Sequence, residues 1–239
     1  MTSVIVAVSA TVDSQEQLTP LSPVTQRMLS GLRSAIAADP DPWEVEVWPT
    51  AWFQDTQSHK IPDNSLFCPL TIELPPHLPF PGAKVFQLAQ DIPRLRQWIS
   101  EELNHQLFAS AEQLGDLWLP IVWTAKGPLY AEVIGEGELP NSYQQPVDLS
   151  DQERQPLYRL AYRLLANLEA PPSVYLLQFS LSETGIVFDR LWPFAAAPAI
   201  ASLGVQAPDL FVCHWRCLRN QPFEDILIRA QVKELAAQS

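Results

Sequence analysis

The stretch SDQERQPLYRLAYRLLANLEAPPSVYLLQFSLSETGIVFDRL, residues 150–191, carries the signals that decide the fold. It opens with Ser150 and then Glu153, the pair of residues that forms a capping box at the start of a helix. Apolar residues recur at helical spacing as far as Ala170, and the two prolines that follow it end the helix. Two apolar runs separated by a short polar turn follow, as in a β-hairpin: Val174–Leu181 and Ile186–Leu191. The stretch therefore predicts antiparallel strands packed on a helix.

Hairpins and helices continue on both sides of this stretch. An upstream hairpin is predicted over Leu117–Trp123 and Leu129–Gly135, and a downstream helix over Asp209–Leu218. From Phe223 onward the pattern fits a strand or a helix equally well. The fold class is α/β, in the α+β sense, with antiparallel hairpins packed on helices in the C-terminal half.

The first half of the chain is a small α/β segment. It is predicted to contain a buried strand at Ser3–Thr11 and a helix that begins at Ser22, with Pro23 in its first position. Two further strands and a second amphipathic helix starting near Asp91 are also expected; the strands are Trp43–Phe53 and Ser65–Leu74. The proline-rich run Leu74–Gly82 is the best internal boundary. The predicted organisation is an N-terminal segment (residues 1–82), a helical connector (83–116) and a C-terminal half (117–239). Alternatively, the three parts form one continuous globular unit.

Composition excludes several classes of function. Hydrophobic residues make up 47% of the chain and charged residues 18%, as in a folded globular protein. The net charge of −12 disfavours nucleic acids and anionic membrane surfaces as partners. No apolar run is long enough to span a bilayer, and the N-terminus lacks the basic flank of a signal peptide, so we expect a cytoplasmic protein. The three cysteines fit free thiols in a reducing compartment.

Five fragments of the second half, in the same order and with similar spacing, resemble one enzyme family. Leu119–Val122 and Lys126–Leu129 are similar to a strand and its "DGIL"-type turn, and Gly185–Pro193 (GIVFDRLWP) is similar to "GLLINELAP". The other two fragments are Leu164–Phe179 and Phe211–Arg216, the latter followed by Gln221–Phe223. Over residues 117–225 the chain resembles the later part of the ATP-grasp domain of the carboxyaminoimidazole ribonucleotide synthases. These enzymes use ATP, Mg²⁺ and bicarbonate.

The departures from that family lie at the residues its chemistry needs. The resemblance places the first metal-binding glutamate at Leu177 or Gln178, and the Asn-Glu pair at Asp189 and Arg190. A shifted alignment that places Asp189 at the second glutamate restores one metal ligand but not two. An arginine cannot bind Mg²⁺, and its charge repels the metal. The family's anion-binding segment corresponds to residues 194–199, which are apolar here, and residues 1–116 contain neither the Gly-rich phosphate loop nor two suitable lysines. We therefore expect a degraded site with no cofactor.

Other polar residues are candidates for a site in the second half. Arg190, His214 and Arg216 would contact an anion in what remains of the cleft, or would serve only as structural ion pairs and caps. Cys213, His214 and Cys217 are too few for a zinc site and are better interpreted as buried residues, so no metal site is predicted.

Tryptophans are numerous, and part of them could form an interface. Eight occur in the chain, and Trp48, Trp52 and Phe53 lie beside prolines where exposure is plausible. Aromatic side chains are enriched at protein–protein interfaces, although burial in the core is their more common fate. Another protein is therefore the expected partner.

Two functions follow from the sequence. The first is a non-catalytic, ATP-grasp-derived protein that acts by binding, as a scaffold, assembly or regulatory partner. The alternative is an ATP-dependent carboxylate ligase with a rebuilt site, which requires at least two carboxylates to converge, for example Asp189 with Glu132 or Glu183. A purely structural subunit of a larger complex differs from the first only in its partners.

Overall fold

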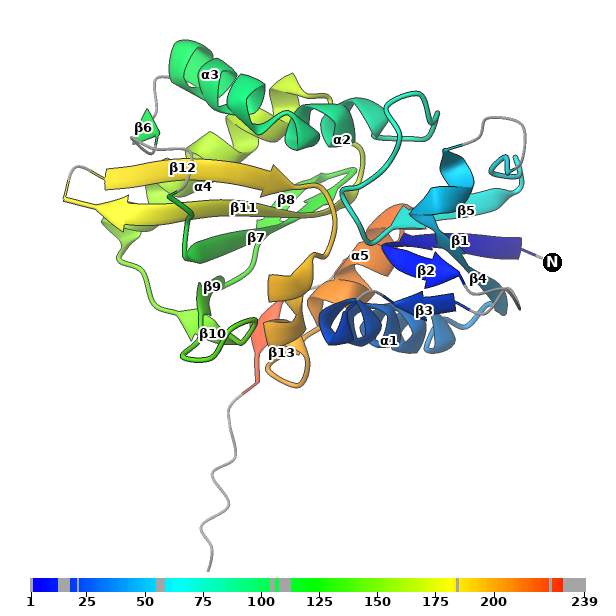
Figure 1. Ribbon diagram of the computed structural model, residues 1–239. Coiled ribbons are helices and arrows are strands. Elements are labelled where there is room, and N and C mark those ends of the chain that lie inside the picture. The colour runs from blue at the N-terminus through cyan, green and yellow to red at the C-terminus, as the bar shows by residue number, and fades with distance from the viewer. Residues whose placement is uncertain are drawn as a thin grey trace, which may run out of the picture.

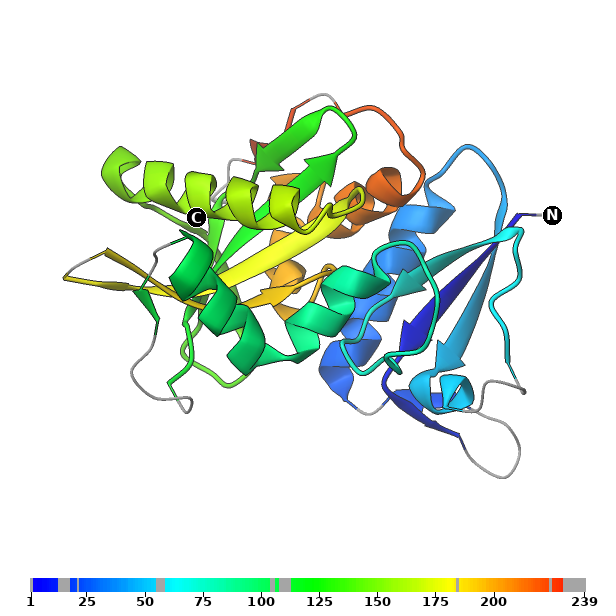
Figure 2. The ribbon, with the colours of Figure 1, turned by 90° about the horizontal axis from the view of Figure 1, so that it is seen from above.

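Two β-sheets form the framework of the computed structural model, with the N-terminal sheet beside the larger C-terminal one (Figures 1 and 2). The structure describes residues 2–12, 18–20, 22–54, 59–103, 106–107, 113–183, 185–223 and 225–229. Within them, none of the helices is long and apolar enough to cross a membrane.

The N-terminal sheet is parallel, and its central strand β1 (Thr2–Val8) lies between β4 (Trp43–Pro49) and β5 (Ser65–Pro69). The crossover helix α1 (Pro23–Ala37) begins as predicted, because the Ser22 hydroxyl accepts the Thr25 N–H at 3.1 Å. The predicted strand over Trp43–Phe53 is shorter than expected. After Pro49 the chain turns into the 3₁₀ helix η1 (Thr50–Phe53). A small hairpin, β2 (Ala10–Val12) and β3 (Leu18–Pro20), follows β1.

The C-terminal sheet has seven strands in the order β10-β9-β7-β11-β12-β6, with β8 paired to β7. The predicted hairpin over Val174–Leu191 is confirmed as β11 and β12, which pair antiparallel. The predicted strand Leu129–Gly135 is wrong as one element, because it divides into β8 and β9, both paired to β7. The bounds are β6 (Gln106–Leu107), β7 (Leu117–Thr124), β8 (Gly127–Tyr130), β9 (Val133–Glu136), β10 (Tyr143–Val147), β11 (Ser173–Ser182) and β12 (Gly185–Trp192).

Helices cover both faces of this sheet (Figure 1). One face packs against α2 (Ala83–Gln90), α3 (Ile92–Leu103) and α4 (Asp151–Asn167). The capping box of α4 is formed, with the Ser150 N–H donating to Glu153 Oε2 at 2.7 Å, so the helix begins at Asp151 and includes Pro156. The other face packs against α5 (Leu210–Leu218) and the 3₁₀ helix η2 (Ala197–Ser202). The segment after Phe223, which the sequence left open, adds β14 (Leu227–Ile228) to β13 (Gln206–Ala207).

One hydrophobic core joins the two sheets. It includes buried residues of β1 and α1 together with Val174 and Leu176 of β11 and Phe211 of α5. Asp39, just after α1, strengthens the junction by accepting hydrogen bonds from the Trp215 indole and the Arg219 guanidinium. The N-terminal sheet is thereby held in a fixed place beside the larger sheet, and the space between them is defined by packed side chains.

The contact of α1 with α5 requires a glycine. A Cβ at Gly31 would lie 2.7 Å from Cδ2 of Phe211, whose ring is fully buried. We expect Gly31→Ala to lower the free energy of unfolding by about 1–3 kcal/mol, because overpacking outweighs the gain in helix propensity. Ser34→Ala, at an exposed position of the same helix, should change it by less than about 0.5 kcal/mol. Equal stabilities of the two variants in urea unfolding would contradict the packing argument.

Candidate ligand cleft between the two sheets

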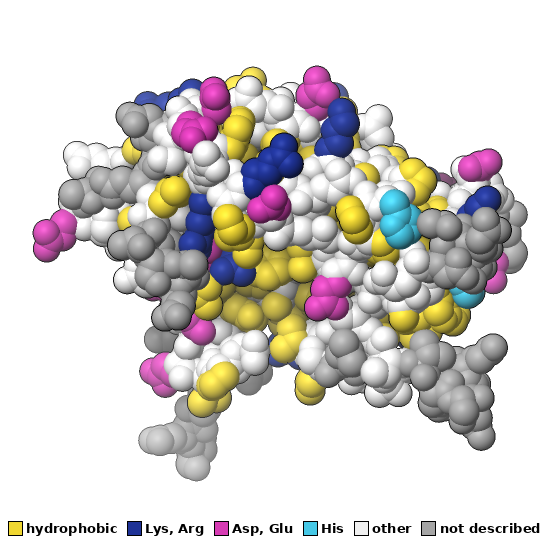
Figure 3. All heavy atoms as spheres, turned by 45° about the horizontal axis from the view of Figure 1, so that its top comes forward, with side chains coloured by type: hydrophobic (Ala, Val, Ile, Leu, Met, Phe, Trp, Pro, Cys, Tyr) yellow, Lys and Arg dark blue, Asp and Glu magenta, His cyan; other side chains and the backbone are white. Residues whose placement is uncertain are grey.

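A cleft of about 440 Å³ lies between the N-terminal sheet and the face of the large sheet that carries α5 and η2. Its N-terminal wall contains the first turns of α1 and the segment after β5, which is the carboxyl end of the parallel sheet. In α/β sheets, ligands bind at this end of the strands. A neighbouring cavity of about 300 Å³ shares four lining residues with it: Ile72, Glu73, Arg190 and Trp192. Figure 3 shows a hollow with a hydrophobic floor, with basic side chains at one rim and acidic side chains at another.

The pleat of β11 decides which residue faces the cleft. Leu177 is fully buried on the opposite face, in the core beneath α3 and α4. Gln178 lines the cleft, where its amide donates to the Gly115 carbonyl and accepts the Trp192 indole N–H at 2.9 Å. The resemblance left two positions open for the first metal ligand, and Gln178 is the one that lies on the cleft. Its side chain is a neutral amide, and both ends of the amide already have protein partners.

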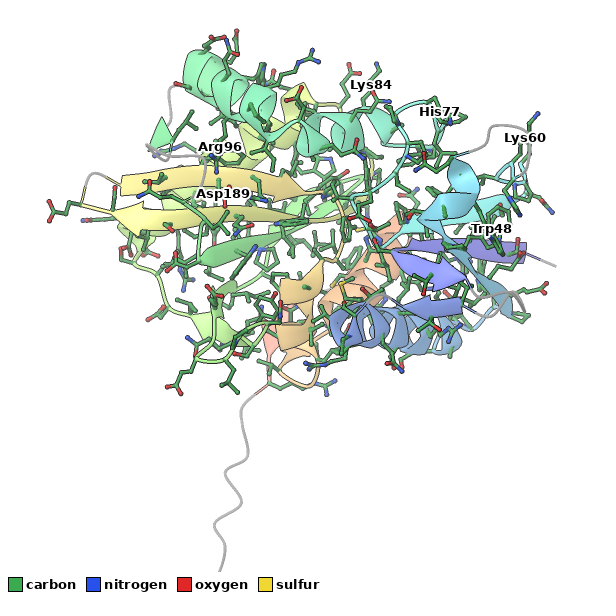
Figure 4. All side chains as sticks on the ribbon, in the orientation of Figure 1. Trp48, Lys60, His77, Lys84, Arg96 and Asp189 are labelled. Atoms are coloured by element: carbon green, nitrogen blue, oxygen red, sulfur yellow. The ribbon has the colours of Figure 1, made fainter. Side chains whose placement is uncertain are left out.

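Asp189 is fully buried, and its side chain lies beside that of Arg96 (Figure 4). Oδ1 lies 2.6 Å from Nη2 of Arg96, a residue of α3, and 3.1 Å from Nε of Arg190. Oδ2 accepts the Gly115 N–H at 2.8 Å. The pairing of β11 with β12 shifts register at this point, so that Gln178 lies opposite Arg190 and Phe179 opposite Phe188. Asp189 is thus the extra residue of a β-bulge, and it stabilises two guanidinium groups.

Arg190 extends into the cleft beside the aromatic ring of Trp192. Its guanidinium carbon lies 5.9 Å from that ring centroid, and its side chain is 20% exposed. The strand register places Trp118, Gln178 and Arg190 in one row across β7, β11 and β12. Tyr143 packs edge-on against Trp118 at one end of the row. The wall at residues 194–198 is apolar, as expected, and contributes Phe194, Ala196, Ala197 and Pro198.

The opposite wall carries hydroxyl groups and one carboxylate. The Ser9 hydroxyl donates to Oε2 of Glu73 at 2.9 Å and lies 2.8 Å from the Thr71 hydroxyl. Thr71 and Glu73 line the cleft with Thr25 of α1. Glu73 and Arg190 both line it, and they form no ion pair with each other in the part of the chain that the structure describes. The cleft therefore presents opposite charges on its two walls.

The other two predicted anion contacts lie elsewhere, which corrects the predicted grouping. His214 is buried in α5 and lines a separate cavity of about 630 Å³ beside β5. Its Nδ1 accepts the Val174 N–H at 3.3 Å, its Nε2 lies 3.4 Å from the Cys68 sulfur, and burial lowers its pKa to about 4. Arg216 lines none of these cavities. Arg190, His214 and Arg216 are therefore not brought together in one site. The face of α5 that carries His214 packs into the core, away from the cleft that Arg190 lines.

The predicted aromatic interface is also changed. Phe53 is only 1% exposed and belongs to the core, so it cannot serve as a surface contact. Trp48 and Trp52 are half-buried and surround His59, which stacks on Trp52 with ring centroids 4.6 Å apart. The Trp48 indole donates to Glu46 at 3.1 Å.

Two of the carboxylates named for the ligase alternative, Glu132 and Asp189, pair with different arginines. Glu132 pairs with Arg154 at 3.1 Å, and Glu183 lies in the turn between β11 and β12. No group of three His, Cys, Asp or Glu residues that could hold a metal ion occurs among the described residues. The two cysteines of α5 are buried, and burial raises the pKa of both thiols: Cys213 and Cys217.

Two residues of this site were missed by sequence reasoning. Arg96 is buried in α3 beside Leu95 and Ile99. The sequence signal that could have identified it is a basic residue on an otherwise apolar helix face. Trp118 and Leu119 are consecutive residues of β7, so the strand pattern predicts that their side chains lie on opposite faces of the sheet. The pattern does not predict that the Trp118 indole N–H lacks a hydrogen-bond partner among the described residues.

No family model matches the sequence, and no curated protein matches it. Solved structures do match. N5-carboxyaminoimidazole ribonucleotide synthetase from Thermus thermophilus aligns with a TM-score of 0.66 and 13% identity over 96% of this chain and 81% of that chain. N5-carboxyaminoimidazole synthetase from Staphylococcus aureus gives 0.66 and 8% over 95% and 79%. Glycinamide-RNase-transformylase T from Mycobacterium tuberculosis gives 0.63 and 14% over 94% and 81%.

These matches define the class of fold. The chain has an ATP-grasp-like α/β fold, and the similarity extends well beyond residues 117–225, in which the sequence resembles the carboxyaminoimidazole ribonucleotide synthases. Sequence identities this low show a shared fold and carry no activity across.

Proposed function

We propose that this protein is a non-catalytic member of the ATP-grasp fold class that acts by binding, as a scaffold, assembly or regulatory partner. The observation that carries the proposal is the environment of Asp189. This carboxylate is fully buried, and its oxygens accept from Arg96, Arg190 and the Gly115 N–H.

Electrostatics at this position oppose metal chemistry. Mg²⁺ prefers hard oxygen ligands, and its charge is repelled by guanidinium groups. The cleft offers the Gln178 amide and the Arg190 guanidinium at the positions where the resemblance places two metal-binding carboxylates. ATP hydrolysis depends on the metal to neutralise the transferred phosphoryl group, so these residues support a cleft without that activity.

Calorimetric titration with ATP tests the proposal. We expect no Mg²⁺-dependent binding of ATP in the micromolar range and no release of ADP over the buffer rate. Saturable micromolar binding of ATP that disappears when Mg²⁺ is chelated would overturn the proposal.

The expected partner is another protein, and we propose the half-exposed pair Trp48 and Trp52, with the stacked His59, as the contact. Aromatic side chains contribute strongly to protein interfaces. The cytoplasm is the proposed compartment, consistent with three cysteines that are free thiols: Cys68, Cys213 and Cys217. Co-purification from the native cell, compared between wild type and Trp52→Ala, tests this contact.

A further inference from the structure

The indole N–H of Trp118 has no hydrogen-bond partner within the described part of the chain, although its side chain is almost fully buried. Trp118 is 7% exposed and lines the cleft. An unpaired buried donor costs free energy, roughly 1–3 kcal/mol, unless a ligand or another acceptor satisfies it. The indole nitrogen itself has almost no accessible surface, so an acceptor on a bound molecule satisfies this donor by displacing the side chains that cover it.

Arg190 supplies a second and charged donor in the same cleft. Its Nε is engaged by Asp189, whereas no hydrogen bond or ion pair within the described residues involves its two terminal nitrogens. One strand, β11, separates Trp118 from Arg190 in the row that contains Gln178, and Gln178 already has partners at both ends of its amide. Adjacent strands lie about 4.8 Å apart, so the two available donors stand about 10 Å apart at the backbone.

The remaining surface of the cleft selects a flat, apolar molecule. Its lining includes the aromatic rings of Trp192, Tyr143 and Phe194 and the apolar side chains of Met28 and Leu70. The volume of about 440 Å³ suits a small molecule and not a macromolecule.

The charge of the cleft limits the charge of the ligand. Arg190 is the basic residue in its lining, and Glu73 stands in the other wall. A polyphosphate brings several negative charges and needs several donors or a metal to balance them, whereas one guanidinium balances one carboxylate.

We propose that the cleft binds a small aromatic monocarboxylate, whose carboxylate pairs with Arg190 and whose second oxygen acceptor, at the far end of the ring, takes the Trp118 N–H. The proposal rests on the proposed function, because it requires a cleft that does not hold metal-bound ATP. It adds the chemical class of the ligand, which nothing in the fold specifies.

Three related compounds separate the two interactions. Para-acetylbenzoate carries both a carboxylate and a ketone, para-acetylbenzamide lacks the charge, and para-ethylbenzoate lacks the second acceptor. We expect calorimetry to give sub-millimolar binding of para-acetylbenzoate, with affinity about 10- to 100-fold weaker for the amide and roughly 5-fold weaker for the ethyl compound.

Two variants assign the donors. Trp118→Phe keeps an aromatic ring and removes the N–H, so we expect it to fold and to bind para-acetylbenzoate no better than para-ethylbenzoate. Arg190→Gln should remove the preference for the acid over the amide. Arg216→Gln, outside the cleft, is the matched control and should leave all three affinities unchanged.

The outcomes separate this proposal from the proposed function. Absence of para-acetylbenzoate binding at millimolar concentration, equal affinities for acid and amide, or an unchanged ketone preference in Trp118→Phe would overturn the ligand assignment alone. Displacement of para-acetylbenzoate by ATP only when Mg²⁺ is present would overturn the proposed function as well.

Discussion

Arg96→Met should lower the free energy of unfolding by about 3–5 kcal/mol, the range for removing one partner of a buried ion pair. The side chains of Arg96 and Asp189 are 10% and 0% exposed, and the two groups are 2.6 Å apart. Among the described residues, the variant leaves the buried carboxylate with Arg190 and the Gly115 N–H as its remaining donors. Urea unfolding near neutral pH measures the loss.

Arg94→Met is the matched control, because Arg94 is an exposed arginine of the same helix. It should change stability by less than about 0.5 kcal/mol. In the Arg96→Met background, Asp189→Asn should recover part of the loss, since it removes the unbalanced charge. If Arg96→Met proves as stable as Arg94→Met, the ion pair does not organise the bulge as described.

His214 should make the fold sensitive to acid. Burial lowers its pKa in the folded state to about 4, whereas an unfolded chain has a histidine pKa near 6.5. Between these values the unfolded state binds more protons, so stability contributed by the neutral imidazole is complete above about pH 6.5 and is lost as the pH falls toward about 4. This change in the pKa of His214 corresponds to a loss of about 3 kcal/mol in the free energy of unfolding.

His214→Gln should reduce the stability difference between about pH 7.5 and pH 4 by about this amount, even if the variant is less stable at neutral pH. His77→Gln, at an exposed histidine, should leave the pH profile unchanged. Parallel profiles for wild type and His214→Gln in urea unfolding at a series of pH values would show that His214 is not the acid-sensitive group.

Local signals in the sequence predicted much of the fold. The Ser22 cap and the capping box that starts α4 are contacts between neighbouring residues, so sequence spacing alone reveals them. The two apolar runs and the polar turn between them likewise predicted the hairpin of β11 and β12. The division of Leu129–Gly135 into two strands was missed because both halves are apolar and only their pairing with β7 distinguishes them.

The candidate site was predictable in position and not in detail. Leu177 and Gln178 could be separated only by the sheet face that each occupies. The ion pair of Arg96 with Asp189 joins residues far apart in the chain, and no local pattern specifies such a contact. Neighbouring residues in the sequence predicted Phe53 at a surface and His214 in the cleft. Long-range packing, which those neighbours do not reveal, buries both side chains.

The central claim is that, among the described residues, protein cations fill the surroundings of Asp189 where a metal ion would otherwise bind. Electron paramagnetic resonance of Mn²⁺, titrated with the protein in the presence and absence of ATP, tests it most directly, because free and protein-bound Mn²⁺ give different signals. We expect the protein to bind no Mn²⁺ in the micromolar range and ATP not to promote such binding. One Mn²⁺ bound per chain with micromolar affinity, and bound more tightly with ATP, would contradict the account.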